Sequence, residues 1–265
     1  MHTPYTTLTL DMEDRGLARV TLSRPDSMNA FDETMIEELT HVFAHLATDA
    51  ATRVIVLAAA GRAFCAGADL RWMERQSQNG PAENLADAQR LARMMQTIYT
   101  CPKPVIARVQ GSAYGGGVGL LCACDIVVAS VQARFVISEA KFGIVPAVIS
   151  PYLTNAVGKR HASRLALTAE LFDAAFAEKI GFVHEVVEAD GLDGAVERFV
   201  GLMLANGPLA LGEVKRLFQY LAVGPIDETV REHTAHTIAR LRATDEAKEG
   251  FAAFLDKRPA KWSIQ

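Results

Sequence analysis

Two segments decide the fold of this sequence: FCAGAD at residues 64–69 and YGGGVG at residues 114–119. Each follows a short apolar run rich in β-branched residues and opens a stretch with helical character. A helix N-terminus built from small residues leaves backbone N–H groups unpaired and sterically open. Two such termini facing one another could hold one oxygen atom that becomes negative during a reaction.

Strands and helices alternate around these two segments. Residues 54–57, VIVL, are typical of a strand covered on both faces, and they lead into the first glycine segment. Strands are also predicted at residues 6–11 and 17–22, joined by a turn at Gly16, and at residues 105–107, 126–128 and 135–137. Asp32 is placed to cap a helix whose apolar residues have helical spacing: Met35, Ile36, Leu39, Val42, Phe43 and Leu46. This alternation predicts a layered α/β superhelix.

The second part of the chain is predicted to be helical. The polar stretch 74–87 contains Gly80 and Pro81 and is expected to be a mobile loop before a helix over residues 85–99. Helices are expected at residues 160–168, 174–180, 192–204, 209–221 and 226–241. We therefore predict a core domain over residues 1–200 and a helical region over residues 201–265 that packs on this core or on a neighbouring subunit.

Composition excludes several classes of protein. The 265 residues are 50% hydrophobic, enough for a full core, and the net charge of −4 argues against nucleic acid or an anionic membrane as a partner. No run approaches the roughly 18 apolar residues of a membrane span. The first residues carry no basic region before an apolar one, so we expect no signal peptide and a cytoplasmic location. The four cysteines form no C-x-x-C pair and are expected to be buried in a reducing compartment.

The glycine triplet does not belong to a nucleotide-binding or nucleophile motif. It fits neither G-x-G-x-x-G nor G-x-x-x-x-G-K-[ST]. Ser112 lies between Gln110 and Tyr114 and so is not the nucleophile of a G-x-S-x-G elbow. On spacing alone, the triplet could equally serve only to let a helix pack closely.

Histidines do not indicate a metal site. His41 and His45 share one helix face and His233 and His236 another, but neither pair carries the glutamate of H-E-x-x-H. Both pairs are interpreted as solvated helix faces, and we expect neither a metal ion nor a cofactor.

Carboxylates are better candidates for chemistry. Glu139 ends the strand-like run at residues 135–138, and side chains at the end of such a strand commonly project into a site. The residues alone leave open a surface glutamate paired with Lys141. Asp69 could cap the helix after the first glycine segment, and Asp125 could play a similar part between a helix and a strand.

Several spaced motifs together resemble the crotonase, or enoyl-CoA hydratase/isomerase, superfamily. They are, in family order, RAFCAGADL at residues 62–70, GSAYGGG at 111–117, CDI at 124–126, Glu139, FGIVP at 142–146, AEKIGFV at 177–183 and FLDKR at 254–258. The resemblance covers nearly the whole chain. It implies a spiral of ββα units over residues 1–200. It also implies that the C-terminal helical region over residues 201–265 closes the site and supports assembly as a homotrimer or a hexamer.

The resemblance also implies site residues for an acyl-CoA substrate. Backbone N–H groups of Ala68 and Gly116 would form an oxyanion hole for the thioester carbonyl, and Glu139 would be the acid and base. Coenzyme A would lie along Met28, Ala30, Ala66, Asp69 and Leu70, with Phe254 and Lys257 near its adenine and phosphates, often from a neighbouring subunit. Arg24 and Arg62 are weaker candidates for a phosphate contact.

Gly119 departs from the hydratases of this superfamily, which resemble one another in placing a first glutamate at that position. A glycine has no side chain to exchange a proton. Glu139 could then act alone on water, or shuttle a proton as in single-glutamate isomerases, or the space beside Gly119 could be polar room for a larger or carboxylated acyl group.

Residues 143–152, GIVPAVISPY, resemble hydratases of branched-chain and isoprenoid catabolism, of the methylglutaconyl-CoA and isohexenylglutaconyl-CoA types. We therefore expect an enoyl-CoA hydratase of fatty-acid or branched-chain acid metabolism. An isomerase, or an acyl-CoA binding protein with impaired catalysis, is the alternative.

Overall fold

Two sheets form the centre of the molecule. A computed structural model describes residues 5–221 and 224–263. In that part of the chain, a six-stranded sheet has the order β1-β2-β3-β5-β7-β10 and a four-stranded sheet has the order β4-β6-β8-β9. The strands are β1 (Leu8–Glu13), β2 (Leu17–Leu22), β3 (Val54–Ala59), β4 (Ala63–Cys65), β5 (Val105–Val109), β6 (Ser112–Tyr114), β7 (Ile126–Ser130), β8 (Arg134–Val136), β9 (Phe172–Asp173) and β10 (Glu185–Val187).

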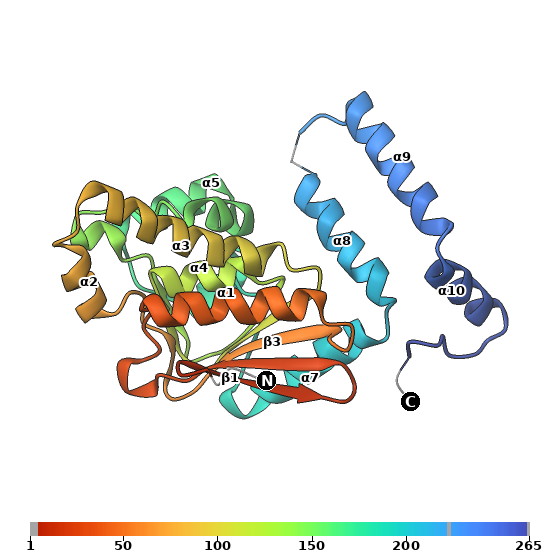
Figure 1. Cartoon of the computed structure of the whole chain (residues 1–265), viewed down its shortest axis with the longest axis horizontal. Coiled ribbons are helices and arrows are strands. Elements are labelled where there is room, and N and C mark those ends of the chain that lie inside the picture. The colour runs from red at the N-terminus through yellow and green to blue at the C-terminus, as the bar shows by residue number, and fades with distance from the viewer. Residues whose placement is uncertain (1–4, 222–223, 264–265) are drawn as a thin grey trace.

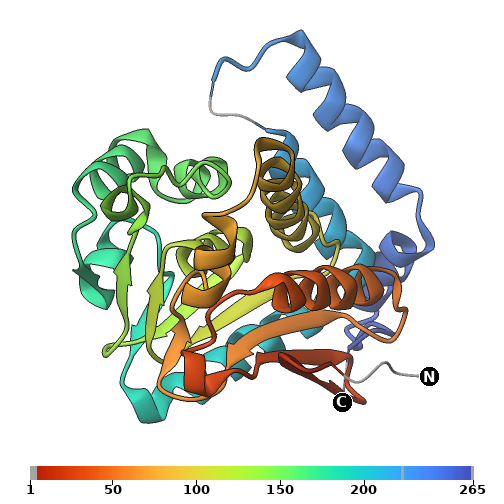
Figure 2. The same ribbon diagram turned by 60° about the vertical axis from the view of Figure 1, so that its left-hand side comes forward.

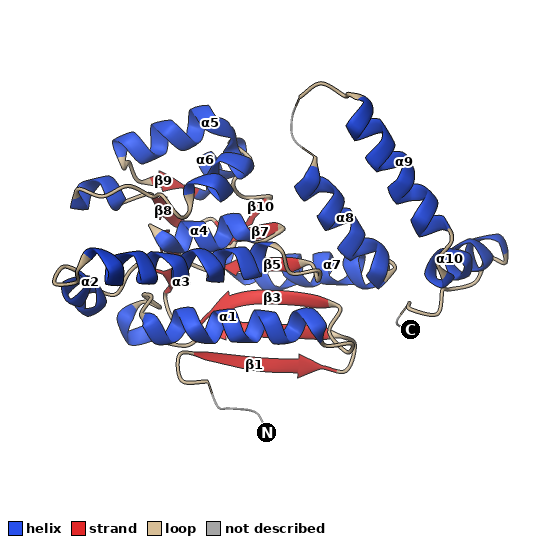
Figure 3. Ribbon diagram, turned by 45° about the horizontal axis from the view of Figure 1, so that its top comes forward, coloured by secondary structure: helices blue, strands red, loops and turns tan. Residues whose placement is uncertain are grey.

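The chain winds as a spiral through these sheets. Three successive pairs, β3 and β4, β5 and β6, and β7 and β8, each add one parallel strand to the large sheet and one to the small sheet. Helices follow each pair, and Figure 3 shows them stacked over the strands. The predicted α/β superhelix is confirmed, because these three turns of the chain repeat the same alternation of strands and helices.

Both faces of the large sheet are covered, as the VIVL run predicts. Ile55 and Leu57 of β3 belong to the main hydrophobic core, whereas Val54 and Val56 belong to a second cluster. Alternate residues of a strand point to opposite faces, so a strand buried on both faces needs a continuous apolar run. Helix α7 (Leu192–Leu204) covers the second face with its buried side chains.

Helices α1 (Glu33–Thr48), α3 (Pro81–Tyr99) and α4 (Gly116–Ala123) cover the first face (Figure 1). The predicted cap of α1 is confirmed, because Asp32 Oδ1 accepts a hydrogen bond of 2.9 Å from the N–H of Met35. All the apolar residues predicted for its inner face are buried. The remaining helices of this part are α2 (Leu70–Gln76), α5 (Ser150–Thr168) and α6 (Ala174–Lys179), with short turns η1 (Pro25–Ser27), η2 (Glu139–Phe142) and η3 (Ala189–Gly191).

The mobile loop predicted over residues 74–87 is wrong for most of its length. Helix α2 continues to Gln76, and α3 begins at Pro81 rather than at residue 85. Proline fits the first turn of a helix, where its missing N–H has no partner to lose. Glu83 accepts a hydrogen bond of 2.8 Å from the N–H of Gly80, so this backbone donor before the start of α3 also has a hydrogen-bond partner.

The C-terminal helices leave the compact core. Helix α8 (Pro208–Tyr220) lies beside the core, whereas α9 (Glu228–Arg242) and α10 (Asp245–Leu255) extend away from it (Figures 1 and 2). Lys215 of α8 pairs with Asp125 at 2.7 Å and donates to the carbonyl oxygen of Lys103 at 3.0 Å. The domain boundary expected at residue 200 falls inside α7. Across the described residues, no helix has the length and apolarity needed to cross a membrane.

Candidate active site

The two glycine segments meet at one end of the spiral. Gly67 has φ +88°, and a side-chain carbon there would lie 2.9 Å from the carbonyl oxygen of Tyr114 and 3.8 Å from the nitrogen of Gly116. The neighbouring N–H of Ala68 and the N–H of Gly116 enter no hydrogen bond within the described chain. The segments therefore bring two unused backbone donors close together, as an oxyanion hole requires.

Close packing explains the glycines of the second segment. A side-chain carbon at Gly116 would lie 2.8 Å from Cε2 of Phe31, and one at Gly117 would lie 2.6 Å from the carbonyl oxygen of Cys65. Any larger residue would push α4 away from the first segment. The triplet thus serves close packing, and the same packing holds the donor of Gly116 in place.

Glu139 lies beside the same triplet. It opens η2 directly after β8, and its Oε1 would be 3.3 Å from a side-chain carbon at Gly115. Its Oε2 is buried and accepts no hydrogen bond from the described residues. Burial raises the pKa of Glu139, against the opposing effect of its own N–H and that of Ser138. A carboxyl group with a raised pKa and a free oxygen is suited to exchanging protons.

One cavity of about 400 Å³ joins these groups. Ala68, Gly116 and Glu139 all line it, so the structure brings together the three residues predicted to act on the reacting atoms. The rest of the lining is mainly apolar: Phe31, Trp72, Ala88, Leu91 and residues 144–149. We call this space the acyl cavity. Such a lining suits a hydrocarbon chain.

Gly119 faces hydrocarbon, which contradicts one of the three alternatives, that of polar room beside it. A side-chain carbon at Gly119 would lie 2.3 Å from Cγ2 of Ile149 and 3.1 Å from Cε of Met95. Both of these side chains are buried. Position 119 therefore has no space for a substrate group, and the neighbours that fill it can neither donate nor accept a proton.

Asp87 is a second carboxylate on the acyl cavity, which the sequence analysis missed. Its Oδ1 pairs with Arg90, and its Oδ2 accepts from Gln76 at 3.3 Å and from Asn79 at 3.2 Å. These contacts tie α2 and the following turn to α3. Asp87 lies four residues before Leu91, so helical spacing places both side chains on one face of α3. The prediction of a loop over residues 74–87 left this spacing unused.

The residues predicted along coenzyme A are partly brought together. Ala66 donates its N–H to the carbonyl oxygen of Met28 at 3.0 Å, and Leu70 is highly exposed at the start of α2. Ala30 is buried. Asp69 caps α2 by accepting from the N–H of Arg71 at 2.9 Å, which confirms its predicted structural role.

Arg24 is occupied within the protein. Its guanidinium lies 3.1 Å from carboxylate oxygens of both Asp32 and Asp69. These contacts favour a role in joining the caps of α1 and α2. Arg62 is exposed and lies 3.8 Å from the sulfur of Met28.

Phe254 and Lys257 are distant from the acyl cavity within one chain. Phe254 lies at the end of α10 and is 83% exposed, and Lys257 follows it. Figure 1 shows α10 at the opposite side of the molecule from α2. Neither residue lines the acyl cavity of its own chain.

Histidines of the two predicted helix faces contact neighbouring side chains. His41 is hydrogen bonded to Tyr5 at 3.0 Å, and His233 stacks on Tyr220 with ring centroids 3.8 Å apart. His236 lies 3.5 Å from Glu232. Among the described residues, no group of three or more His, Cys, Asp or Glu side chains is arranged to hold a metal ion.

The fold and the site define a class of enzyme that acts on acyl-CoA thioesters. Residues 12–265 match the family model for enoyl-CoA hydratase/isomerase, and the chain belongs to this family. A probable enoyl-CoA hydratase of Rhizobium meliloti is 36% identical over 264 residues, covering 97% of this chain and 98% of that protein. A crotonyl-CoA hydratase of Syntrophomonas wolfei is 32% identical, covering 97% and 98%. The crystal structure of an enoyl-CoA hydratase from Shewanella pealeana superposes with a TM-score of 0.94 at 43% identity, covering 97% of this chain and 96% of that one.

Proposed function

We propose that this enzyme adds water across the 2,3-double bond of an enoyl-CoA thioester. The observation that supports this most strongly is the unpartnered, buried Oε2 of Glu139 on the same cavity as Ala68 and Gly116. The matched family supports an acyl-CoA substrate, and the names of its relatives favour hydration.

Glu139 would carry both proton transfers. The carboxylate takes a proton from water while the water oxygen bonds to the β-carbon. The electrons move onto the thioester oxygen, where the N–H groups of Ala68 and Gly116 stabilise the enolate. Protonated Glu139 then gives its proton to the α-carbon, and the carboxylate is restored. Asp87 is poorly suited to this work because both of its oxygens already have partners.

A single-glutamate isomerase is the second candidate, and the apolar surroundings of Gly119 favour it. Moving a double bond needs one group that carries a proton between the α- and γ-carbons, and no second acid. An assay with trans-2- and trans-3-enoyl-CoA esters separates the two reactions. Hydration removes the absorbance of the conjugated enone from the first ester, whereas isomerisation creates it from the second.

The expected result is loss of conjugated absorbance from the trans-2 ester and uptake of solvent deuterium at the α-carbon. Absorbance gained from the trans-3 ester alone would instead make the enzyme an isomerase. Tight binding of both esters with neither turnover nor exchange would contradict both reactions and leave an acyl-CoA binding protein.

We also propose that the chain assembles as a homotrimer or hexamer and that Phe254 and Lys257 reach coenzyme A in a neighbouring subunit. Large apolar side chains exposed on and beside the C-terminal helices support this: Phe218 at 70%, Ile226 at 78% and Leu255 at 77%. Light scattering should give three or six times the chain mass, and a monomer would overturn the proposal. The double variant F254A/K257A should raise KM for the ester more than it lowers kcat.

A further inference from the structure

The chain turns sharply where α10 ends, and a lysine occupies the critical position. Lys257 has φ +53°, a left-handed backbone conformation that glycine adopts much more readily. The N–H of Arg258 donates to the carbonyl oxygen of Ala253 at 3.0 Å, and the N–H of Lys257 donates to that of Phe254 at 3.3 Å. These bonds form a Schellman motif, in which the left-handed residue is usually glycine. A lysine in this strained position indicates a role for its side chain.

Glu249 of α10 pairs with two of the three cations that follow the helix. Its oxygens accept hydrogen bonds from the guanidinium of Arg258 at 2.7 Å and 3.1 Å, and Oε2 lies 3.9 Å from Nζ of Lys261. The N–H of Lys261 also donates to Glu249 at 2.9 Å. The third cation, Lys257, is exposed, and across residues 5–221 and 224–263 its ammonium group has no carboxylate partner. Its charge is therefore available to an anion from outside the chain.

Arg53 holds the far end of this segment, residues 256–262, which we call the C-terminal turn. Arg53 lies just before β3 and donates to the carbonyl oxygen of Trp262 at 2.7 Å. It also donates to the carbonyl oxygens of Leu204 at 2.7 Å and Asn206 at 3.1 Å, where α7 leads into α8. Figure 1 shows the chain turning back from α10 towards the core. The C-terminal turn is thus fixed at both ends, on α10 and beside β3.

We propose that Glu249 and Arg53 position Lys257 so that its ammonium group contacts the phosphates of a coenzyme A thioester bound in a neighbouring subunit. This inference rests on the proposed function, which supplies both the ligand and the contact between subunits. The same charge on a freely moving segment would meet the phosphates only part of the time, and the apparent affinity falls with that fraction. Glu249 and Arg53 are therefore positioning residues, which act through Lys257 and not by touching the ligand.

The test compares a coenzyme A thioester with the same acyl group on pantetheine, which lacks the nucleotide and its phosphates. The measured quantity is Kd for butyryl-pantetheine divided by Kd for butyryl-CoA, obtained by calorimetry. K257A should lower this ratio about fivefold, the upper range for one exposed ion pair. E249Q should lower it about two- to fivefold, because the C-terminal turn then holds Lys257 in place for less of the time.

E170Q is the matched control for E249Q. Glu170 also accepts two hydrogen bonds from one guanidinium, that of Arg164, at 2.8 Å and 3.0 Å. This pair lies at the end of α5 and makes no contact with the C-terminal turn. The ratio for E170Q should equal that of the wild type.

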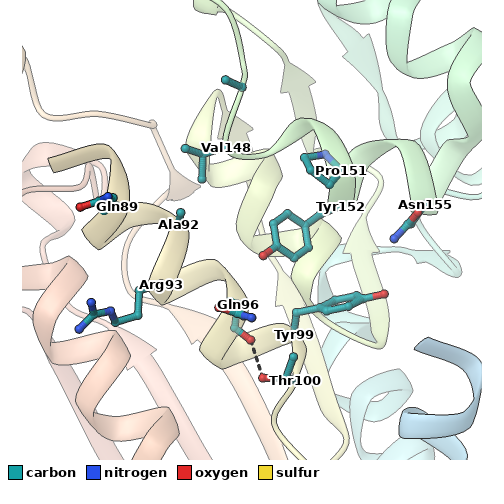
Figure 4. A pocket seen from close by; sticks show the side chains of 11 residues that line it. Gln89, Ala92, Arg93, Gln96, Tyr99, Thr100, Val148, Pro151, Tyr152 and Asn155 are labelled. Atoms are coloured by element: carbon teal, nitrogen blue, oxygen red, sulfur yellow. Dashed lines mark hydrogen bonds between the residues drawn. The ribbon is translucent and has the colours of Figure 1, made fainter. Parts of the chain in front are cut away.

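R53Q repeats the test at the other end of the C-terminal turn, with R93Q as its control. Figure 4 shows Arg93 on α3, at the edge of a hollow between α3 and α5, and its side chain is exposed. R53Q should lower the ratio as E249Q does, and R93Q should leave it unchanged. If R53Q does not fold, E249Q decides the test, because glutamine keeps the size of that side chain.

The double variant E249Q/K257A separates positioning from a general loss of stability. If Glu249 acts through Lys257, the double variant should have the same ratio as K257A. Additive losses, or an unchanged ratio in E249Q while K257A lowers it, would overturn the proposal. A changed assembly mass of E249Q in light scattering would assign this ion pair to assembly and also overturn it.

These binding ratios also separate this inference from the proposed function, because turnover plays no part in them. A wild type that shows all the expected ratios but hydrates no enoyl-CoA ester would remove the proposed reaction and leave the positioning role. An unchanged ratio in K257A would instead remove the proposed contact with coenzyme A, and the positioning role with it.

Discussion

Positions 115 and 119 are four residues apart around the start of α4, yet their surroundings are opposite in character. Beside Gly115 lies the carboxylate of Glu139, and against Gly119 lies the buried side chain of Ile149. One side of the helix start therefore holds an ionisable group with an unpartnered oxygen, and the other side holds only hydrocarbon. The contrast supports the proposal that Glu139 alone carries the proton transfers, with a pKa that burial raises.

The largest expected effect comes from removing the ionisable carboxyl group of Glu139. E139Q keeps the shape of the side chain but cannot accept a proton, so kcat/KM for an enoyl-CoA should fall about 10²–10⁴-fold. The exposed Glu37 gives a control, E37Q, which should retain wild-type turnover. Full activity of E139Q on every ester tried would remove Glu139 from the mechanism.

The next largest effect tests the apolar surroundings of Gly119. G119E should destabilise the fold by about 1–3 kcal/mol through overpacking against Ile149, with the cost of an unpaired buried carboxylate added. The matched control is G201E, because a side chain at Gly201 meets nothing within 4 Å. The double variant G119E/I149A should recover part of the loss in urea unfolding. A G119E protein that is as stable as the wild type would show that the side chains around position 119 move aside at little cost in free energy.

A smaller effect concerns pH. The acidic limb of the kcat/KM profile should lie above 4.5, the ordinary pKa of a glutamate, because burial raises the pKa of Glu139. Activity should fall as the pH drops through that raised value, since only the carboxylate can take a proton from water. The residual activity of E139Q should lack this limb. A limb at or below the ordinary value would contradict the burial effect.

The smallest effect concerns stability. A carboxyl whose pKa is higher in the folded than in the unfolded state binds more protons when folded, so its ionisation costs stability as the pH rises through those two values. E139Q should therefore have a higher Tm than the wild type at neutral pH. The difference should vanish below the unfolded pKa, where both states are protonated. A lower Tm at neutral pH would show that the carboxylate is stabilised by contacts rather than strained by burial.

Local patterns predicted much of the architecture. The cap at Asp32 and the apolar face of α1 follow from helical spacing, and the double burial of β3 follows from its continuous apolar run. The prediction failed at residues 81–87, where polar residues hid a helix start. Contacts from outside the helix stabilise that start, namely those of Asp87 with Gln76 and Asn79.

The sequence by itself determined the family, the spiral order of strands and helices, and the three groups that meet in the acyl cavity. The order of strands and helices follows from local rules, because strand runs, caps and glycine turns depend on neighbours in the chain. The family and the three groups follow from the resemblance of the spaced motifs to that family. Only the tertiary structure decided what surrounds Gly119 and that Glu139 keeps a buried oxygen without a partner. It also decided which side chains line the acyl cavity. Burial and close contact between segments far apart in sequence set these features, and no local pattern encodes them.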